Sequence, residues 1–183
     1  MTGLIIALVV IALIVIYFIS TYNNLVNLRN KVNDQWSQID VELKRRFDLI
    51  PNLVNTVKGY TKHESETLEN VVKARNTYLS AGNREQAMEA DGELTNAITK
   101  LFALAESYPD LKANENFKDM QSQLTDTENK VSYARKFYND TALQLNNKIE
   151  MFPSNIVAKL FKFSKVDFFK ANEAERENVK VEF

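Results

Sequence analysis

The sequence begins with a long apolar segment that carries no charge. The first charged side chain is Arg29, and the stretch from Leu4 to Ile19 is almost unbroken Leu, Ile and Val. With its flanking neutral residues it reaches about 20 residues, which as a helix rising about 1.5 Å per residue spans a hydrocarbon core of about 30 Å. We therefore predict that residues 1–21 form a transmembrane anchor and that any function is exercised at a lipid bilayer.

A cleaved signal peptide is the main alternative to a retained anchor. It requires basic residues before the apolar segment and small residues at the cleavage site. Here no Lys or Arg precedes the segment, and bulky Tyr22 with Asn23 and Asn24 stands where small residues are needed. We expect a retained anchor, with a cleaved leader or a buried soluble helix as the alternatives.

The orientation of the anchor follows from the basic residues around it. All Lys and Arg lie after the span, with Arg29 and Lys31 nearest to it. Because basic residues are concentrated on the cytoplasmic side of membrane proteins, we expect the bulk of the chain to be cytoplasmic.

The amino-acid composition limits the fold and the partners expected for residues 22–183. A net charge of −1 provides no basic field, so nucleic acid is not an expected partner. The chain has no Cys, which excludes disulfides and thiol catalysis. Four Gly and three Pro in 183 residues are few for a β-rich fold with many turns.

Apolar residues recur with a helical period through most of the body. Four amphipathic stripes can be traced, and the first steps by three or four residues throughout. They run from Leu25 to Ile50, Leu53 to Tyr78, Ala87 to Tyr108 and Phe117 to Phe152. The pattern predicts an all-α fold in which the transmembrane helix is followed by an antiparallel up-down four-helix bundle over 22–152.

Local signals mark the breaks between these helices. Gly82 suits the position after a helix end, and Asn83 with Gln86 three residues later is typical of an N-cap. Pro51 is harder to interpret, because the apolar stripe keeps its phase across it. We expect a sharp break there, with Pro51 in the first turn of the next helix; a mere kink in one long helix is the alternative.

Residues 153–183 form a separate C-terminal segment. Ser154 is expected to cap a short helix, after which Phe161, Phe163, Phe168 and Phe169 alternate with Lys residues. Such a basic amphipathic segment can lie at the membrane surface. The alternative is that these Phe side chains close the end of the core. The last residues, from Ala171, are polar.

Catalytic and metal-binding patterns are missing from the sequence. His63 is the single histidine, and Thr67 stands where a zinc-peptidase helix needs its second histidine. The chain has no Gly-rich phosphate loop and no strand-turn-helix serine. We therefore expect no catalytic residue, no metal and no cofactor.

Charged and polar residues on the apolar stripes are the remaining candidates for a site. They are Lys44, Arg45, Arg46, Glu64, Arg75, Glu128, Arg135 and Asn139. Unpaired buried charges cost several kcal/mol, so these groups must pair between helices or meet a ligand. One interpretation is a structural polar layer that fixes the helix register; the other is a ligand or partner site.

The longest distinctive string is Lys44-Arg45-Arg46-Phe47-Asp48-Leu49-Ile50-Pro51-Asn52-Leu53-Val54. With the strings at 22–26, 36–41, 57–60, 106–117 and 152–155, it makes the chain resemble the LemA family of bacterial membrane-anchored proteins. The resemblance implies an amino-terminal anchor in the bacterial cell membrane, a four-helix bundle and no established enzymatic activity. It also implies an accessory role beside another membrane protein, such as a metallopeptidase or a TPM-domain protein.

We therefore expect a non-enzymatic interaction or scaffold module, with the lipid bilayer and another membrane protein as its partners. A ligand-sensing bundle with a polar pocket between helices is the alternative, and an unrecognised enzyme is the least favoured.

Overall fold

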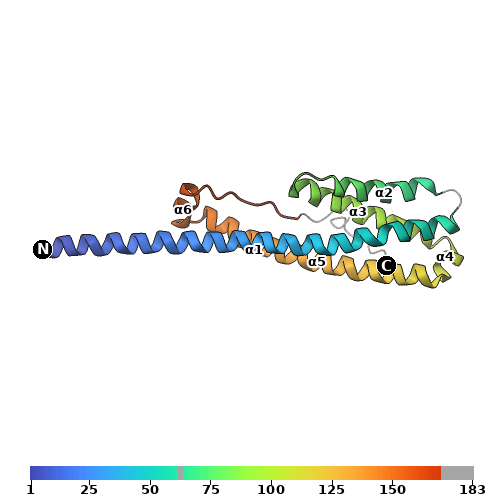
Figure 1. Cartoon of the computed structure of the whole chain (residues 1–183), viewed down its shortest axis with the longest axis horizontal. Helices are drawn as coiled ribbons and strands as arrows, with labels where there is room; N and C mark the ends of the chain where they lie inside the picture. Colours follow the sequence, from blue (N-terminus) through green and yellow to red (C-terminus); the bar gives the residue numbers. More distant parts are fainter. Residues whose placement is uncertain (62–63, 170–183) are drawn as a thin grey trace, which may run out of the picture. The chain divides into compact units, whose positions relative to one another are not determined.

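The computed structural model describes residues 1–61 and 64–169, and these are helical with no strand among them. The helices are α1 (Thr2–Tyr60), α2 (Ser65–Leu79), α3 (Arg84–Ala105), α4 (Pro109–Ala113), α5 (Glu115–Glu150) and α6 (Ser154–Leu160) (Figure 1). The all-α prediction is confirmed, whereas the up-down four-helix bundle stays a prediction. His63 and the polar stretch from Ala171 lie outside the described residues.

The chain divides into two compact units, and both long helices contribute to each. Unit 1 contains Met1–Ile39 and Ala134–Phe168, and unit 2 is built mainly from Asp40–Tyr133. The proposed domain boundary at residue 21 stays a prediction, since α1 passes it without a break.

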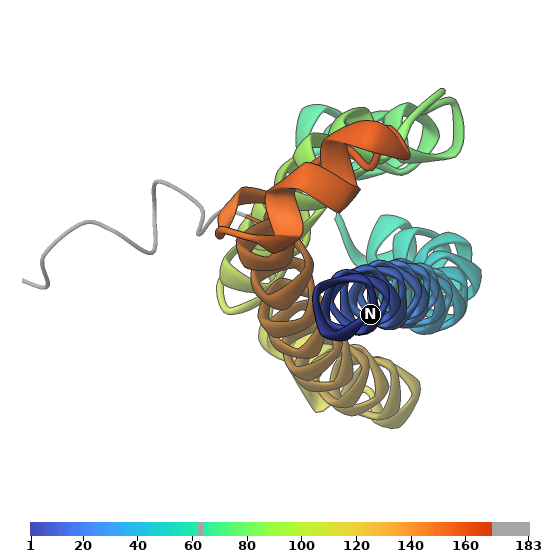
Figure 2. The same ribbon diagram turned by 90° about the vertical axis from the view of Figure 1, so that its left-hand side faces the viewer.

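Unit 1 combines the apolar start of α1 with the C-terminal part of α5 and with α6. Residues 1–17 are exposed, and burial in α1 begins with Thr21, Leu25 and Val32 on one face. The C-terminal part of α5 runs beside this face in both views (Figures 1 and 2). Trp36 meets Tyr138 of α5 edge-to-face, with 5.7 Å between ring centroids. Packing against protein therefore starts where the apolar span ends.

A side-chain amide of α5 holds the chain that follows α6. Asn146 donates from Nδ2 to the Val166 carbonyl at 2.9 Å, and its Oδ1 accepts the Val166 N–H at 3.0 Å. Ser154 does not cap α6 as expected, because Pro153 occupies the N-cap position. The Ser154 hydroxyl instead reaches the Lys148 and Met151 carbonyls, at 2.7 and 2.9 Å, and so satisfies backbone groups at the end of α5.

Unit 2 contains the C-terminal part of α1, then α2, α3 and α4, and the first part of α5. Asn83 is the N-cap of α3, as predicted, and its Oδ1 accepts the Gln86 N–H at 2.9 Å. Asn114 does the same for α5 by accepting the Phe117 N–H at 3.0 Å. Pro109 opens α4, where a fixed φ and a missing N–H are tolerated.

The expected break at Pro51 is wrong, because α1 continues through it to Tyr60. A proline within a helix leaves the carbonyl four residues earlier without its donor, and here that carbonyl belongs to Phe47. Arg75 of α2 supplies the missing partner: its Nε donates to the Phe47 carbonyl at 3.2 Å. A contact from a neighbouring helix thus replaces the lost backbone hydrogen bond and allows α1 to continue.

Candidate functional site

A buried arginine joins three helices of unit 2. Arg46 of α1 is 1% exposed. Its Nη1 lies 3.2 Å from Oδ1 of Asp91 in α3 and 2.9 Å from Oε2 of Glu128 in α5. Its Nη2 donates to the Thr95 hydroxyl at 3.0 Å. We call Arg46, Asp91, Thr95 and Glu128 the Arg46 cluster.

The Arg46 cluster compensates charges that water cannot reach. Asp91 is also 1% exposed, so its carboxylate is kept from water and pairs with the Arg46 guanidinium. Removing one partner from such a buried pair costs about 3–5 kcal/mol, because the other charge stays buried. Each of the three helices therefore has to place its polar side chain at the same level along the helix axes. That arrangement is the one expected of a structural polar layer.

Asp91 and Thr95 are the members of this cluster that the sequence did not reveal, and Asp91 is the charged one. It lies four residues after Ala87 and three before Leu94, on the buried face of α3. A carboxylate at that spacing within an apolar stripe is the signal that could have identified it.

The three consecutive basic residues of α1 have different environments. Arg46 is buried, whereas Lys44 and Arg45 are exposed. Arg45 acts on the surface of α5: its charge, after the larger effect of the Lys130 ion pair, helps to lower the pKa of Asp126. Lys44 and Arg45 are therefore the basic residues of this group that a partner can reach.

Glu64 and Arg75 each have a hydrogen-bond partner outside the Arg46 cluster. Glu64 accepts a hydrogen bond from the Tyr108 hydroxyl at 3.2 Å. Desolvation, followed by this bond and the Glu64 charge, raises the pKa of Tyr108 above its ordinary value of 10.0. Arg75 bonds to the Phe47 carbonyl, as described above.

Arg135 and Asn139 belong to unit 1, where both are half-buried on α5. The aromatic candidates also differ in placement. Phe161 and Phe163 lie against Tyr22 of α1, with 4.6 and 6.0 Å between ring centroids. Phe168 is exposed and Phe169 is half-buried.

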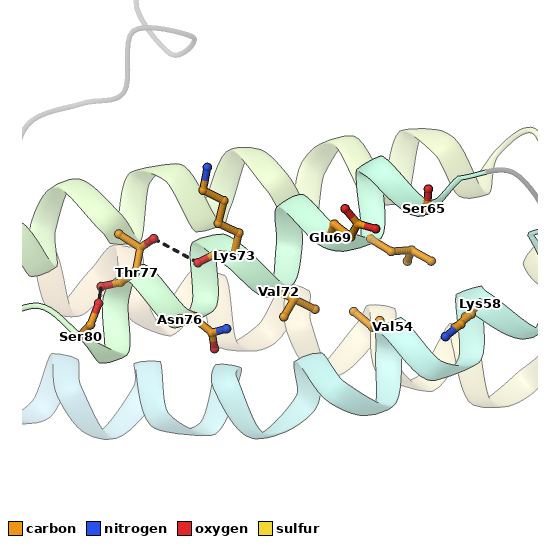
Figure 3. A pocket seen from close by; sticks show the side chains of 10 residues that line it. Val54, Lys58, Ser65, Glu69, Val72, Lys73, Asn76, Thr77 and Ser80 are labelled. Carbon is orange, nitrogen blue, oxygen red and sulfur yellow. Dashed lines mark hydrogen bonds between the residues drawn. The ribbon is translucent and has the colours of Figure 1, made fainter.

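Two hollows accompany these residues in unit 2. A small one of about 190 Å³ lies beside Arg46 and Glu128 and is also lined by Thr99, Phe102 and Asn129. A larger open groove of about 720 Å³ lies between α1 and α2 (Figure 3). We call it the α1–α2 groove.

The α1–α2 groove has an apolar floor and a charged edge. Val54 of α1 and Val72 of α2 point toward each other across it (Figure 3), and Leu68 completes the apolar part. Lys58, Glu69 and Lys73 supply the charged groups. Val72 remains 40% exposed, so apolar surface here is open to a partner.

Within residues 1–61 and 64–169, no three His, Asp or Glu side chains converge in a way that could hold a metal ion. The Arg46 cluster sets one guanidinium against two carboxylates, and the Thr95 hydroxyl lies between them, 3.0 Å from Nη2 of Arg46 and 3.5 Å from Oε1 of Glu128.

Comparison with known proteins gives the chain its family. The family model described as LemA family matches residues 35–183. Protein LemA of Metamycoplasma hominis is 26% identical over 163 residues, covering 88% of this chain and 74% of the relative. Magnetosome protein MamQ 1 of Paramagnetospirillum magneticum is 26% identical over 199 residues, covering 92% and 73%. Magnetosome protein MamQ of Magnetospirillum gryphiswaldense is 25% identical over 197 residues, covering 91% and 72%.

The apolar start of α1 agrees with a membrane-associated protein. It has a mean hydropathy of 3.1, it is not buried, and α1 is the one described helix long and apolar enough to cross a bilayer. Since the family model covers most of the chain, with its helices and their Arg46 cluster, this protein belongs to the LemA family.

Proposed function

We propose that this protein is a membrane-anchored, non-enzymatic interaction module that binds another membrane protein through the α1–α2 groove. The single observation that carries the proposal is the apolar floor of that groove, in which Val72 is exposed, Val54 is half-buried and Leu68 is buried beneath them. An apolar centre with a charged edge is the usual composition of a surface that binds protein.

The shape and charge of the groove suit an amphipathic helix. Such a helix places apolar side chains at intervals of three or four residues into a groove between helices. Lys58 and Lys73 then favour acidic residues on its flanks, while Glu69 accepts one basic residue. The exposed Lys44 and Arg45 would add to attraction of an acidic partner.

The anchor restricts the choice of partner. A bundle attached to the bilayer at the start of α1 meets membrane proteins at high local concentration. The basic residues after the span support a cytoplasmic position at the bacterial cell membrane. Membrane metallopeptidases and TPM-domain proteins are the partner classes that the family resemblance suggests.

The test uses the full chain in its native membranes. A photo-activated crosslinking residue at Val72 is expected to capture one reproducible membrane protein. The same residue at Val41, an exposed valine of unit 2 outside the groove, is the matched control. Val72→Glu should abolish capture of that protein by a second crosslinker placed at Lys73, and Val41→Glu should not. Equal capture from both sites, or capture insensitive to Val72→Glu, contradicts the proposal.

A ligand sensor is the second candidate, supported by the small hollow beside the Arg46 cluster. Its polar lining, with Thr99 and Asn129 near Glu128, suits a small neutral or cationic molecule better than an anion, because two carboxylates already neutralise Arg46. A metabolite that raises the melting temperature of the full chain, and no longer does so in Thr99→Val, would favour this function.

A further inference from the structure

Unit 1 exposes a cluster of large apolar side chains around α6. They are Met151, Phe152, Ile156, Leu160 and Phe161, and their exposed fractions range from 50% to 79%. We call these five residues the α6 patch. Soluble surfaces carry single exposed apolar residues, but several together mark a binding or membrane surface.

The side chains of the α6 patch do not close the end of the core, because they point away from it. The side of α6 that faces the rest of unit 1 carries Val157 and Ala158, which are buried. Ile156 and Leu160, four residues apart, share a different side of the helix and are exposed. The hydrogen bonds of Ser154 and Asn146 hold both ends of the segment on α5. The exposed side is therefore presented by a fixed element.

The α6 patch lies level with the point at which α1 leaves the apolar span. Phe161 stacks 4.6 Å from Tyr22, centroid to centroid, and Tyr22 follows the span directly. About two turns further along α1, the Arg29 guanidinium lies 5.3 Å from the Phe163 ring centroid. Tyr side chains and basic residues are enriched at the boundary between lipid and water. If α1 crosses the bilayer, α6 lies at that boundary.

The charge of the segment fits an anionic lipid surface. No Asp or Glu occurs between Glu150 and Asp167, whereas Lys159, Lys162 and Lys165 do. Lys165 pairs with Glu150, and Lys159 and Lys162 are exposed beside the apolar side chains. Apolar residues flanked by lysines are typical of segments that lie in the headgroup region.

We propose that the α6 patch inserts into the same membrane leaflet from which α1 emerges, with Lys159 and Lys162 among anionic headgroups. Unit 1 then holds the bilayer at two places, the span of α1 and the side of α6. Two attachments fix both the tilt of unit 1 and its rotation about α1, whereas a single membrane span leaves that rotation free. The inference rests on the membrane-anchored part of the proposed function and is independent of the α1–α2 groove.

The test places spin labels on the full chain in vesicles of phosphatidylcholine and phosphatidylglycerol. Because the chain has no Cys, Leu160→Cys provides a unique attachment site. Leu143→Cys is the matched control: it is another exposed leucine of unit 1, at 50% against 63% for Leu160, and it lies on α5 outside the patch. We expect oxygen, which concentrates in lipid, to relax the label at 160 several-fold more strongly than a water-soluble nickel complex does. The ratio should correspond to a label about 5–10 Å below the membrane surface. At 143 the nickel complex should dominate.

Three results would overturn the inference. One is a label at 160 as accessible to the nickel complex as that at 143. Another is a label shielded from both reagents, which would mean that a second copy of the chain covers the patch. The third is a depth unchanged when Lys159→Glu and Lys162→Glu are combined. If any of these occurs while Val72 still crosslinks its partner, the α6 inference fails and the proposed function stands.

Discussion

The two units of this protein hold their helices together by different means. Unit 2 places a buried arginine between carboxylates from two other helices. Unit 1 uses aromatic pairs, a contact of Arg29 with the Phe163 ring and an amide bound to backbone, and its ion pair between Lys165 and Glu150 is exposed. A charge cluster has one low-energy arrangement, because any shift leaves an ion uncompensated. Aromatic and amide contacts tolerate small displacements at lower cost. The comparison indicates that unit 2 depends on helix register and that unit 1 depends on the packing of α1 and of the segment after α5 against the C-terminal part of α5.

The largest expected effect comes from breaking the Arg46 cluster. Arg46→Met removes the guanidinium that Asp91 and Glu128 both contact while the Asp91 carboxylate stays buried, and should lower the free energy of unfolding by about 3–5 kcal/mol. Urea unfolding of the full chain in detergent, followed by circular dichroism, measures this change. Glu93→Ala, on the exposed side of α3, is the control and should stay within about 0.5 kcal/mol. Equal effects of the two variants would refute a register role for the cluster.

A smaller effect is expected where α2 supports the proline of α1. Arg75→Ala leaves the Phe47 carbonyl without a donor and should cost about 1–3 kcal/mol. Pro51→Ala restores a backbone N–H for that carbonyl, so it should recover more stability in the Arg75→Ala background than in the unmodified chain. A double-mutant cycle measures the difference, and strict additivity would show that the two sites are not coupled.

Unit 1 should respond more weakly to loss of its amide contact. Asn146→Ala removes two hydrogen bonds to Val166 and should cost about 1–2 kcal/mol, at a net contribution of about 0.5–1 kcal/mol for each part-buried bond. Hydrogen exchange at the Val166 amide should rise markedly, with little change at the buried α3 amides around Leu94. Uniform loss of protection across both units would instead indicate that the chain unfolds as one cooperative body.

The smallest effect concerns pH. The pKa of Tyr108 is raised in the folded protein, so at alkaline pH the folded state binds more protons than the unfolded state. The contribution is present below the ordinary pKa of 10.0 and is lost as pH rises through the higher folded value. The stability of unit 2 should therefore fall more steeply above about pH 10 in the unmodified chain than in Tyr108→Phe. Identical alkaline slopes would mean that the Glu64 contact does not survive in solution.

Sequence signals correctly predicted features that depend only on neighbouring residues. The Asn83 cap was predicted from its spacing to Gln86, since capping requires only residues of one turn. The Pro51 break was predicted from the same kind of rule and was wrong, because Arg75 replaces the missing donor from 28 residues away. Among the candidate site residues, Arg46 and Glu128 meet in the structure, Glu64 and Arg75 have separate partners, and Asp91 was missed. No spacing rule could pair Arg46 with a carboxylate on a helix whose rotation was unknown.

The sequence by itself determined the apolar span, the helical stripes and the family, since each depends on the order and type of neighbouring residues. Only the tertiary structure decided that α1 passes Pro51, that Arg46 is buried while Lys44 and Arg45 are exposed, and that Phe161 rests on Tyr22. The physical reason is that hydropathy and helix period act over a few residues. The pairing of a buried charge or the rescue of an orphaned carbonyl instead depends on which side chain another helix brings within hydrogen-bond distance.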